Sequence, residues 1–98
     1  MDKPKITING KEIEMQTKAR LWSVVIKFED ERGEFTVTDV VEKYCEIIAV
    51  AFGVTTEEIL DNLDIADVAP TYFKIYNAVY SLLTAKLGKK NETAEEKV

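Results

Sequence analysis

The chain of 98 residues contains no histidine, one cysteine, two prolines and four glycines. Because histidine is absent, no Ser–His or Cys–His pair is available for nucleophilic catalysis. Cys45 has no partner for an internal disulfide, and its neighbours Tyr44, Ile47 and Ile48 suit a small buried core residue. The glycines stand singly, so none belongs to a phosphate-binding loop. We therefore expect no enzyme activity and no cofactor.

Acidic residues outnumber basic ones by 18 to 13, which gives a formal net charge of −5. The basic residues are spread along the chain, whereas nucleic-acid binding needs clustered lysine and arginine. The acidic balance also disfavours an anionic membrane surface, and no run approaches the ~20 apolar residues of a membrane span. With 46 % hydrophobic residues, the composition is that of one small globular domain. Residues 1–4 lead directly into a strand pattern, so we expect no signal peptide.

Residues 4–16 predict a β-hairpin. Asn9-Gly10 suits a two-residue type I′ turn, which needs a positive φ at both central positions. This turn pairs Lys5 with Glu14 and gives the hairpin one apolar face, made of Ile6, Ile8, Ile13 and Met15. A lone hairpin is only marginally stable in water, so this face is expected to pack on a helix or on strands of another copy.

A first helix is expected from about residue 18 to residue 31. Thr17 can serve as its N-cap, and Gly33 suits the left-handed position after its end. Its core stripe consists of Leu21, Val24, Val25 and Phe28. Trp22 lies to one side of this stripe, which fits either the edge of a core or an exposed contact residue.

A second helix is predicted over residues 37–52, with Thr36 or Thr38 as its cap. It has little polar surface, which indicates a central position. Thr55 and Glu58 have the spacing of a capping box and so predict a short third helix. The residues expected to face inward from the third helix are Ile59, Leu60 and Leu63.

The run from residue 68 to residue 87 predicts a last helix with an unusually wide apolar side. This side covers roughly half of the circumference, against ~100° in an ordinary surface helix. Its members are Tyr72, Phe73, Ile75, Tyr76, Val79, Tyr80, Leu82, Leu83 and Leu87. Such a helix must pack against several elements at once or against another chain. Gly88 is expected to end it, and the charged residues 89–98 to form a flexible tail.

The predicted fold class is therefore α+β and mainly α. An N-terminal β-hairpin is followed by a compact four-helix domain, with residues 1–88 forming one domain before the tail.

An acidic cluster precedes the last helix and consists of Glu57, Glu58, Asp61, Asp64 and Asp67. Oxygen-rich sites suit calcium or magnesium, but this spacing is not that of an EF-hand loop and no glycine turn lies within it. We expect a helix start rich in capping groups and no metal site. A DNA-binding helix-turn-helix is a further alternative, with residues 56–62 as recognition helix, but that segment carries acidic residues and no basic one.

Three segments together resemble a known family. They are the hairpin region KITINGKEIEMQTKARLW, the tryptophan-bearing first helix, and the stretch that runs from FTVTDVVEKYC to KLGKKNE. This pattern is similar to the small tail assembly chaperones of long-tailed phages and prophages of Gram-positive bacteria. The resemblance extends to about Asn91. It implies a mostly helical protein of the bacterial host cytoplasm that binds the tape measure protein, recruits tail tube subunits, and is not retained in the virion.

In many such phages a ribosomal frameshift near the 3′ end of the gene makes a longer product. Slippery sites of the G-GGA-AA type encode Gly-Lys, and Gly88-Lys89-Lys90 fits such a site. The same three residues also fit an ordinary helix C-terminus followed by cations.

A chaperone for a long, apolar, helical partner needs an accessible apolar groove. The predicted contact surface is the aromatic side of the last helix with one residue of the first, namely Tyr72, Phe73, Tyr76, Tyr80 and Trp22. These residues could instead fill the chain's own core, because a small domain must bury most of its apolar residues. Self-association through them is a second alternative. A third is a small acidic phage-borne adaptor or regulatory protein that binds a host protein.

Overall fold

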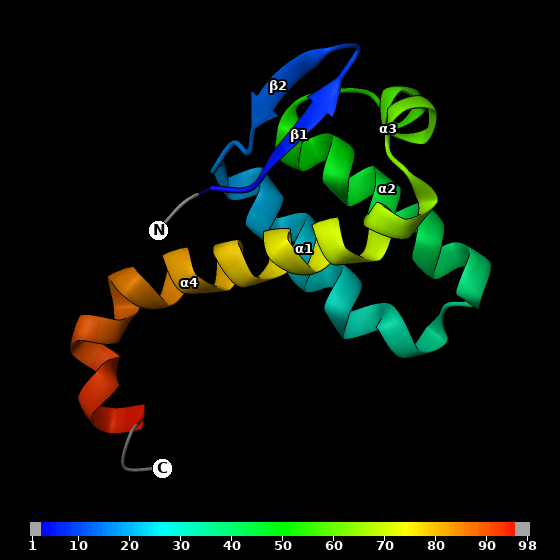
Figure 1. Cartoon of the computed structure of the whole chain (residues 1–98). Coiled ribbons are helices and arrows are strands. Elements are labelled where there is room, and N and C mark those ends of the chain that lie inside the picture. Colours follow the sequence, from blue (N-terminus) through cyan, green and yellow to red (C-terminus); the bar gives the residue numbers. More distant parts are fainter. Residues whose placement is uncertain (1–2, 96–98) are drawn as a thin grey trace.

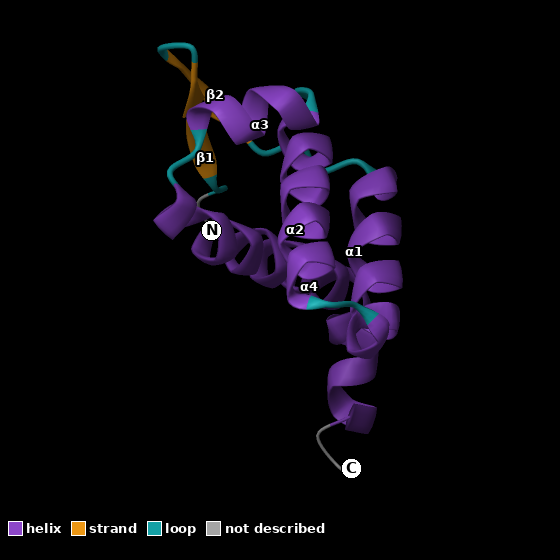
Figure 2. Cartoon of the chain, turned by 90° about the vertical axis from the view of Figure 1, so that its right-hand side faces the viewer, coloured by secondary structure: helices purple, strands orange, loops and turns teal. Residues whose placement is uncertain are grey.

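The computed structural model describes residues 3–95, and the side chains of residues 3–85. Its elements are β1 (Lys5–Ile8), β2 (Lys11–Glu14), α1 (Ala19–Glu31), α2 (Val37–Phe52), α3 (Thr56–Asn62) and α4 (Val68–Glu95), with short 3₁₀ turns at Arg32–Glu34 and Ile65–Asp67. Figure 1 shows α4 crossing one side of α1 and α2, with the hairpin and α3 beyond the end of α2. In Figure 2, α1 and α2 lie side by side. The predicted class, mainly α with an N-terminal hairpin and four helices, is confirmed.

The hairpin has the predicted register, with Lys5 opposite Glu14 and Ile8 opposite Lys11. Asn9 and Gly10 have φ values of 52° and 81°, as a type I′ turn requires. The apolar face packs within the chain, because β1 contacts α3 and its isoleucines are buried in the core. The Asn9 N–H also donates a hydrogen bond to the Asn62 side-chain oxygen at 3.0 Å, which fastens the turn to the end of α3.

Helix α2 is the central element and has the predicted bounds. Thr36 caps its start in a capping box with Asp39, and a second capping box joins Thr55 to Glu58 at the start of α3. Gly53 ends α2 with a φ of 70°. A side chain at Gly53 would be strained by this φ, and its Cβ would lie 2.4 Å from the Gln16 amide nitrogen. The segment that links the hairpin to α1 therefore passes close to the C-terminus of α2.

Several local expectations were wrong. Helix α1 begins after Lys18 without a side-chain cap, so Thr17 does not cap it. Gly33 lies in a 3₁₀ turn and is not among the described residues with positive φ. Leu60 is 56 % exposed although it was expected to face inward.

The C-terminal end of the chain also differs from expectation. Helix α4 continues to Glu95, so the predicted helix end at Gly88 is wrong. Residues 96–98 of the predicted tail lie outside the described residues, and the flexibility of residues 89–98 stays a prediction.

Candidate binding surface between α1 and α4

Tyr72 lies at the centre of an aromatic cluster that joins three helices. Its ring stacks on Tyr44 of α2 at 4.5 Å between centroids and meets Phe28 of α1 edge-on at 5.5 Å. The Tyr72 hydroxyl donates a hydrogen bond to the Glu29 carboxylate. Tyr72 is 0 % exposed. It therefore belongs to the core, and its predicted place on a contact surface is wrong because no partner can reach it in this fold.

Arg32 covers the edge of this cluster. Its guanidinium carbon lies 5.3 Å from the ring centre of Phe28 and 5.5 Å from that of Tyr44, within cation–π range. The same group donates hydrogen bonds to the Tyr44 hydroxyl and, at 2.9 Å, to the Glu29 carboxylate. Burial acts to lower the pKa of Arg32, but the Glu29 charge and the neighbouring tyrosines outweigh it and raise that pKa. Through its contacts with Tyr44, Arg32 links the end of α1 to α2 beside the ring of Tyr72.

The environment of Tyr72 makes the stability of the protein depend on pH in the alkaline range. Burial, and then the hydrogen bond and negative charge of Glu29, raise the pKa of Tyr72 well above its ordinary value near 10. Below about pH 10 the tyrosine keeps its proton in both the folded and the unfolded chain. Above that pH the unfolded chain releases the proton while the folded chain retains it, so alkali favours unfolding.

We expect the free energy of unfolding to fall above about pH 10 by up to ~1.4 kcal/mol per pH unit because of Tyr72. Urea unfolding of the natural chain and of Tyr72→Phe, from about pH 9 to about pH 11, measures this contribution. The phenylalanine variant should show the shallower decline. Equal slopes in the two proteins would contradict the assignment.

Cys45 is a buried core residue, as its neighbours predicted. It is 2 % exposed, and burial raises the pKa of its thiol, to which the charges of Glu42 and Glu46 add. A thiol that is both buried and protonated is a poor nucleophile.

The remaining predicted aromatic residues reach the surface of α4. Tyr76 stacks on Tyr80 at 6.1 Å between ring centroids, and Phe73 lies on the same side of the helix. Tyr80 is 56 % exposed, Phe73 is 45 % exposed, and Tyr76 is half-buried. We call these three residues the aromatic ridge.

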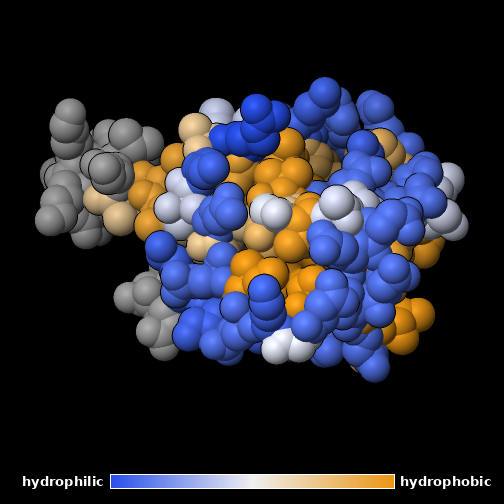
Figure 3. All heavy atoms as spheres, turned by 90° about the horizontal axis from the view of Figure 1, so that it is seen from above, coloured by the Kyte–Doolittle hydropathy of each residue, from blue (hydrophilic) through white to orange (hydrophobic). Residues whose placement is uncertain are grey.

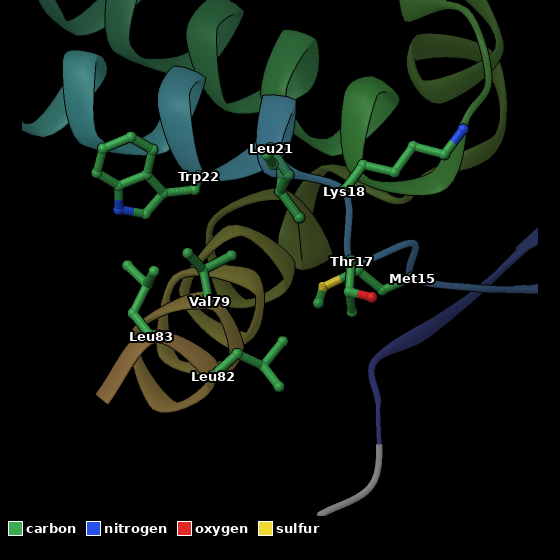
Figure 4. Close-up of a pocket in the computed structure, with 9 residues that line it drawn as sticks. Met15, Thr17, Lys18, Leu21, Trp22, Val79, Leu82 and Leu83 are labelled. Atoms are coloured by element: carbon green, nitrogen blue, oxygen red, sulfur yellow. The ribbon is translucent and has the colours of Figure 1, made fainter. Parts of the chain in front are cut away.

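Trp22 lies at a different place, beside a hollow between the start of α1 and the middle of α4. The hollow has a volume of about 130 Å³. Figure 4 shows Val79 and Leu83 of α4 pointing toward α1, where Trp22 and Leu21 lie opposite them. Its apolar lining is completed by Met15 and Leu82. We call this hollow, defined by Met15, Leu21, Trp22, Val79, Leu82 and Leu83, the α1–α4 groove.

The groove and the aromatic ridge adjoin each other. Leu83, which lines the groove, follows Tyr80 by three residues in the same helix, and side chains at that spacing are neighbours. Trp22 and Leu82 are 44 % and 40 % exposed, so the groove is open at its rim. Figure 3 shows one face of the molecule, on which hydrophobic side chains reach the surface among hydrophilic ones.

Leu82 and Leu83 are groove residues that sequence reasoning did not select. The helical periodicity placed both on the apolar side of the last helix, which was the available signal. Periodicity does not give the position at which α1 crosses α4. That position comes only from the tertiary structure.

Two members of the acidic cluster before α4 stabilise local structure. Glu58 completes the capping box of α3, and the Asp64 carboxylate accepts a hydrogen bond from the Ala66 N–H at 2.8 Å. Within the described part of the chain, no three Asp, Glu, Cys or His side chains are grouped so that they could hold a metal ion. Among the same residues, no helix combines the length and hydropathy needed to cross a membrane.

Comparisons with protein-family models, curated proteins and solved structures found no match for the chain. The resemblance to tail assembly chaperones therefore stays a prediction.

Proposed function

We propose that the chain is a phage tail assembly chaperone that binds apolar helical segments of the tape measure protein and helps to recruit tail tube subunits. The observation that carries the proposal is the exposed apolar surface formed by the α1–α4 groove and the aromatic ridge. The choice of the tape measure protein as partner comes from the family resemblance of the sequence.

The shape and composition of this surface suit a helix as ligand. A groove between two helices can accept the apolar face of an amphipathic helix, whose anchors recur at every third or fourth residue. Trp22 and Tyr80 are of the residue types that most often dominate binding energy at interfaces. Both are roughly half exposed, so a partner can bury further area on each of them.

The charge of the rest of the molecule supports the same role. A net charge of −5 favours solubility while the apolar surface is not covered by a partner. A chaperone needs both properties, because it must expose apolar surface without aggregating.

Co-expression with the tape measure protein that the family resemblance places beside this gene tests the proposal. We expect affinity-tagged chain to capture the tape measure protein, and Trp22→Ala and Tyr80→Ala each to reduce capture by about tenfold or more. Both residues are exposed, so the urea midpoint of each variant should stay near that of the natural chain.

Leu60→Ala is the matched control, because Leu60 is as exposed as Tyr80 but lies on α3. It should leave capture unchanged. If the natural chain captures no tape measure protein, or if all three variants lose capture equally, the proposal is wrong and an adaptor for a host protein becomes the better interpretation. Intact mass of the products made from the native gene region tests the frameshift separately, since a longer species branching near Gly88-Lys89 is expected.

A further inference from the structure

The outer edge of β1 carries backbone groups that point away from the hairpin. In an antiparallel pair, residues that are bonded to the partner strand alternate with residues whose N–H and C=O groups face outward. The Met15 N–H donates to the Pro4 carbonyl at 2.9 Å, so Pro4 and Ile6 are the residues directed toward β2. The N–H and C=O groups of Lys5 and Thr7 therefore face outward.

This edge is paired at the turn and open along the rest of β1. The Asn9 N–H, two residues after Thr7, donates to the Asn62 side-chain oxygen at 3.0 Å. Among the residues that the structure describes, the N–H groups of Lys5 and Thr7 donate to no other protein group. Both residues are exposed.

The outer edge of β2 is used differently. Gln16 continues the outward-facing series of β2, and its N–H donates to the Ala51 carbonyl at 2.8 Å. This bond attaches the end of that edge to the C-terminal turn of α2. The outward-facing groups of β1 at Lys5 and Thr7 have no such attachment.

The open part of the β1 edge borders a hollow of about 410 Å³. Lys5, Ile6 and Thr7 line one side, and Leu63 and Asp64 of the connection from α3 to α4 line the other. Figure 1 shows β1 as the strand of the hairpin nearer to α3. Leu63 and Asp64 have extended backbone, with ψ values of 133° and 143°. We call the space between these two extended stretches, defined by the five residues, the β1 hollow.

We propose that the outer edge of β1 binds an extended peptide strand of a protein partner in the β1 hollow. The donors and acceptors of Lys5 and Thr7 repeat at about 7 Å, twice the rise per residue of a strand, and match the backbone of a second strand. Strand addition of this kind takes its affinity from backbone hydrogen bonds. The β1 hollow and the α1–α4 groove share no residue, so this site is separate from the one in the proposed function.

Other occupants fit the β1 hollow less well. A helix uses its backbone groups within itself, and a phosphate backbone offers acceptors but no donors for the carbonyls of Lys5 and Thr7. A second copy that paired its own β1 here would bring its α3–α4 connection against that of the first copy. A single extended strand avoids this obstruction.

The probe is a synthetic hexapeptide that alternates valine and threonine and is capped at both ends. We expect it to slow hydrogen exchange at the Lys5 and Thr7 amides, and to change exchange little at Ile6 and Ile8, which face β2. The same peptide with every backbone nitrogen methylated keeps its side chains but has no N–H to donate. It should not bind.

A proline variant tests the edge itself. Thr7→Pro removes an outward-facing N–H and should weaken probe binding about tenfold or more. The hairpin should persist, because proline is tolerated in an edge strand where its nitrogen faces away from the ladder. Glu12→Pro is the matched control, since Glu12 stands opposite Thr7 and its nitrogen faces the outer edge of β2. It should leave probe affinity unchanged, and urea midpoints show whether both variants remain folded.

Several results would overturn this inference. They are binding that survives backbone methylation, an equal loss in Thr7→Pro and Glu12→Pro, and no binding up to about 1 mM peptide. Sedimentation that shows a dimer of the natural chain and a monomer of Thr7→Pro would overturn it too, because a second copy would then occupy the edge. Trp22→Ala should reduce capture of the tape measure protein and leave probe binding unchanged, so failure of this inference and failure of the proposed function are distinguishable.

Discussion

Replacement of Tyr72 by alanine is expected to lower the free energy of unfolding by about 3–5 kcal/mol, the usual range for loss of a buried aromatic ring. The ring of Tyr72 is completely buried and touches Phe28, Tyr44 and Phe73, so its removal leaves a cavity between three helices. Domains of this size are stable by about 5–15 kcal/mol, so the variant loses a large share of that stability. Urea unfolding followed by far-UV circular dichroism measures the change.

Two further variants separate the contribution of the Tyr72 ring to stability from that of its hydroxyl and from the effect of removing an exposed ring. Tyr72→Phe keeps the ring and removes only the hydroxyl that donates to Glu29, so a loss of about 1–3 kcal/mol is expected. Tyr80→Ala removes a ring of the same kind from the exposed side of the same helix and should change stability by about 0.5 kcal/mol or less. If Tyr72→Ala costs no more than Tyr80→Ala, Tyr72 is not the centre of the core.

The contrast between these two tyrosines shows where sequence reasoning stops. Helical periodicity assigns both to the same wide apolar side, and it does so correctly. That side proves to be divided, because α1 and α2 cover the part around Tyr72 and Ile75 and leave Phe73 and Tyr80 at the surface. The angle at which helices cross depends on the packing of side chains far apart in sequence, which a periodicity does not encode.

Features that depend on neighbouring residues were predictable from the sequence, although the cap of α2 was narrowed only to Thr36 or Thr38. The turn at Asn9-Gly10 determines the hairpin register, and the threonines before α2 and α3 each stand three residues ahead of an acidic partner. Thr17 failed as a cap because no acidic residue follows it at that spacing and Lys18 occupies the cap position instead. Sequence rules for turns and helix caps succeed where both interacting residues stand at the required spacing along the chain.

The candidate binding surface was only partly predictable for the same reason. Trp22, Phe73, Tyr76 and Tyr80 could be selected by residue type, since large aromatic side chains are enriched at interfaces.

Ile59→Ala is expected to destabilise the protein by about 2–5 kcal/mol, whereas Leu60→Ala should change its stability by about 0.5 kcal/mol or less. The two residues are adjacent, and both were expected to face inward, yet Ile59 is the only buried residue of α3 and Leu60 is exposed. A helix of 7 residues is too short to be stable alone, so α3 depends on its packing against α2 and β1, to which Ile59 contributes its buried side chain.

The Ile59 variant should also loosen the hairpin. Asn62 at the end of α3 accepts the hydrogen bond from the Asn9 N–H, so a displaced α3 releases the turn between β1 and β2. Hydrogen exchange of the hairpin amides should therefore accelerate in Ile59→Ala more than the loss of global stability alone explains, and remain unchanged in Leu60→Ala. Exchange that follows global stability in both variants would show that the hairpin is held by its own apolar face, through Ile6, Ile8 and Met15, and not through α3.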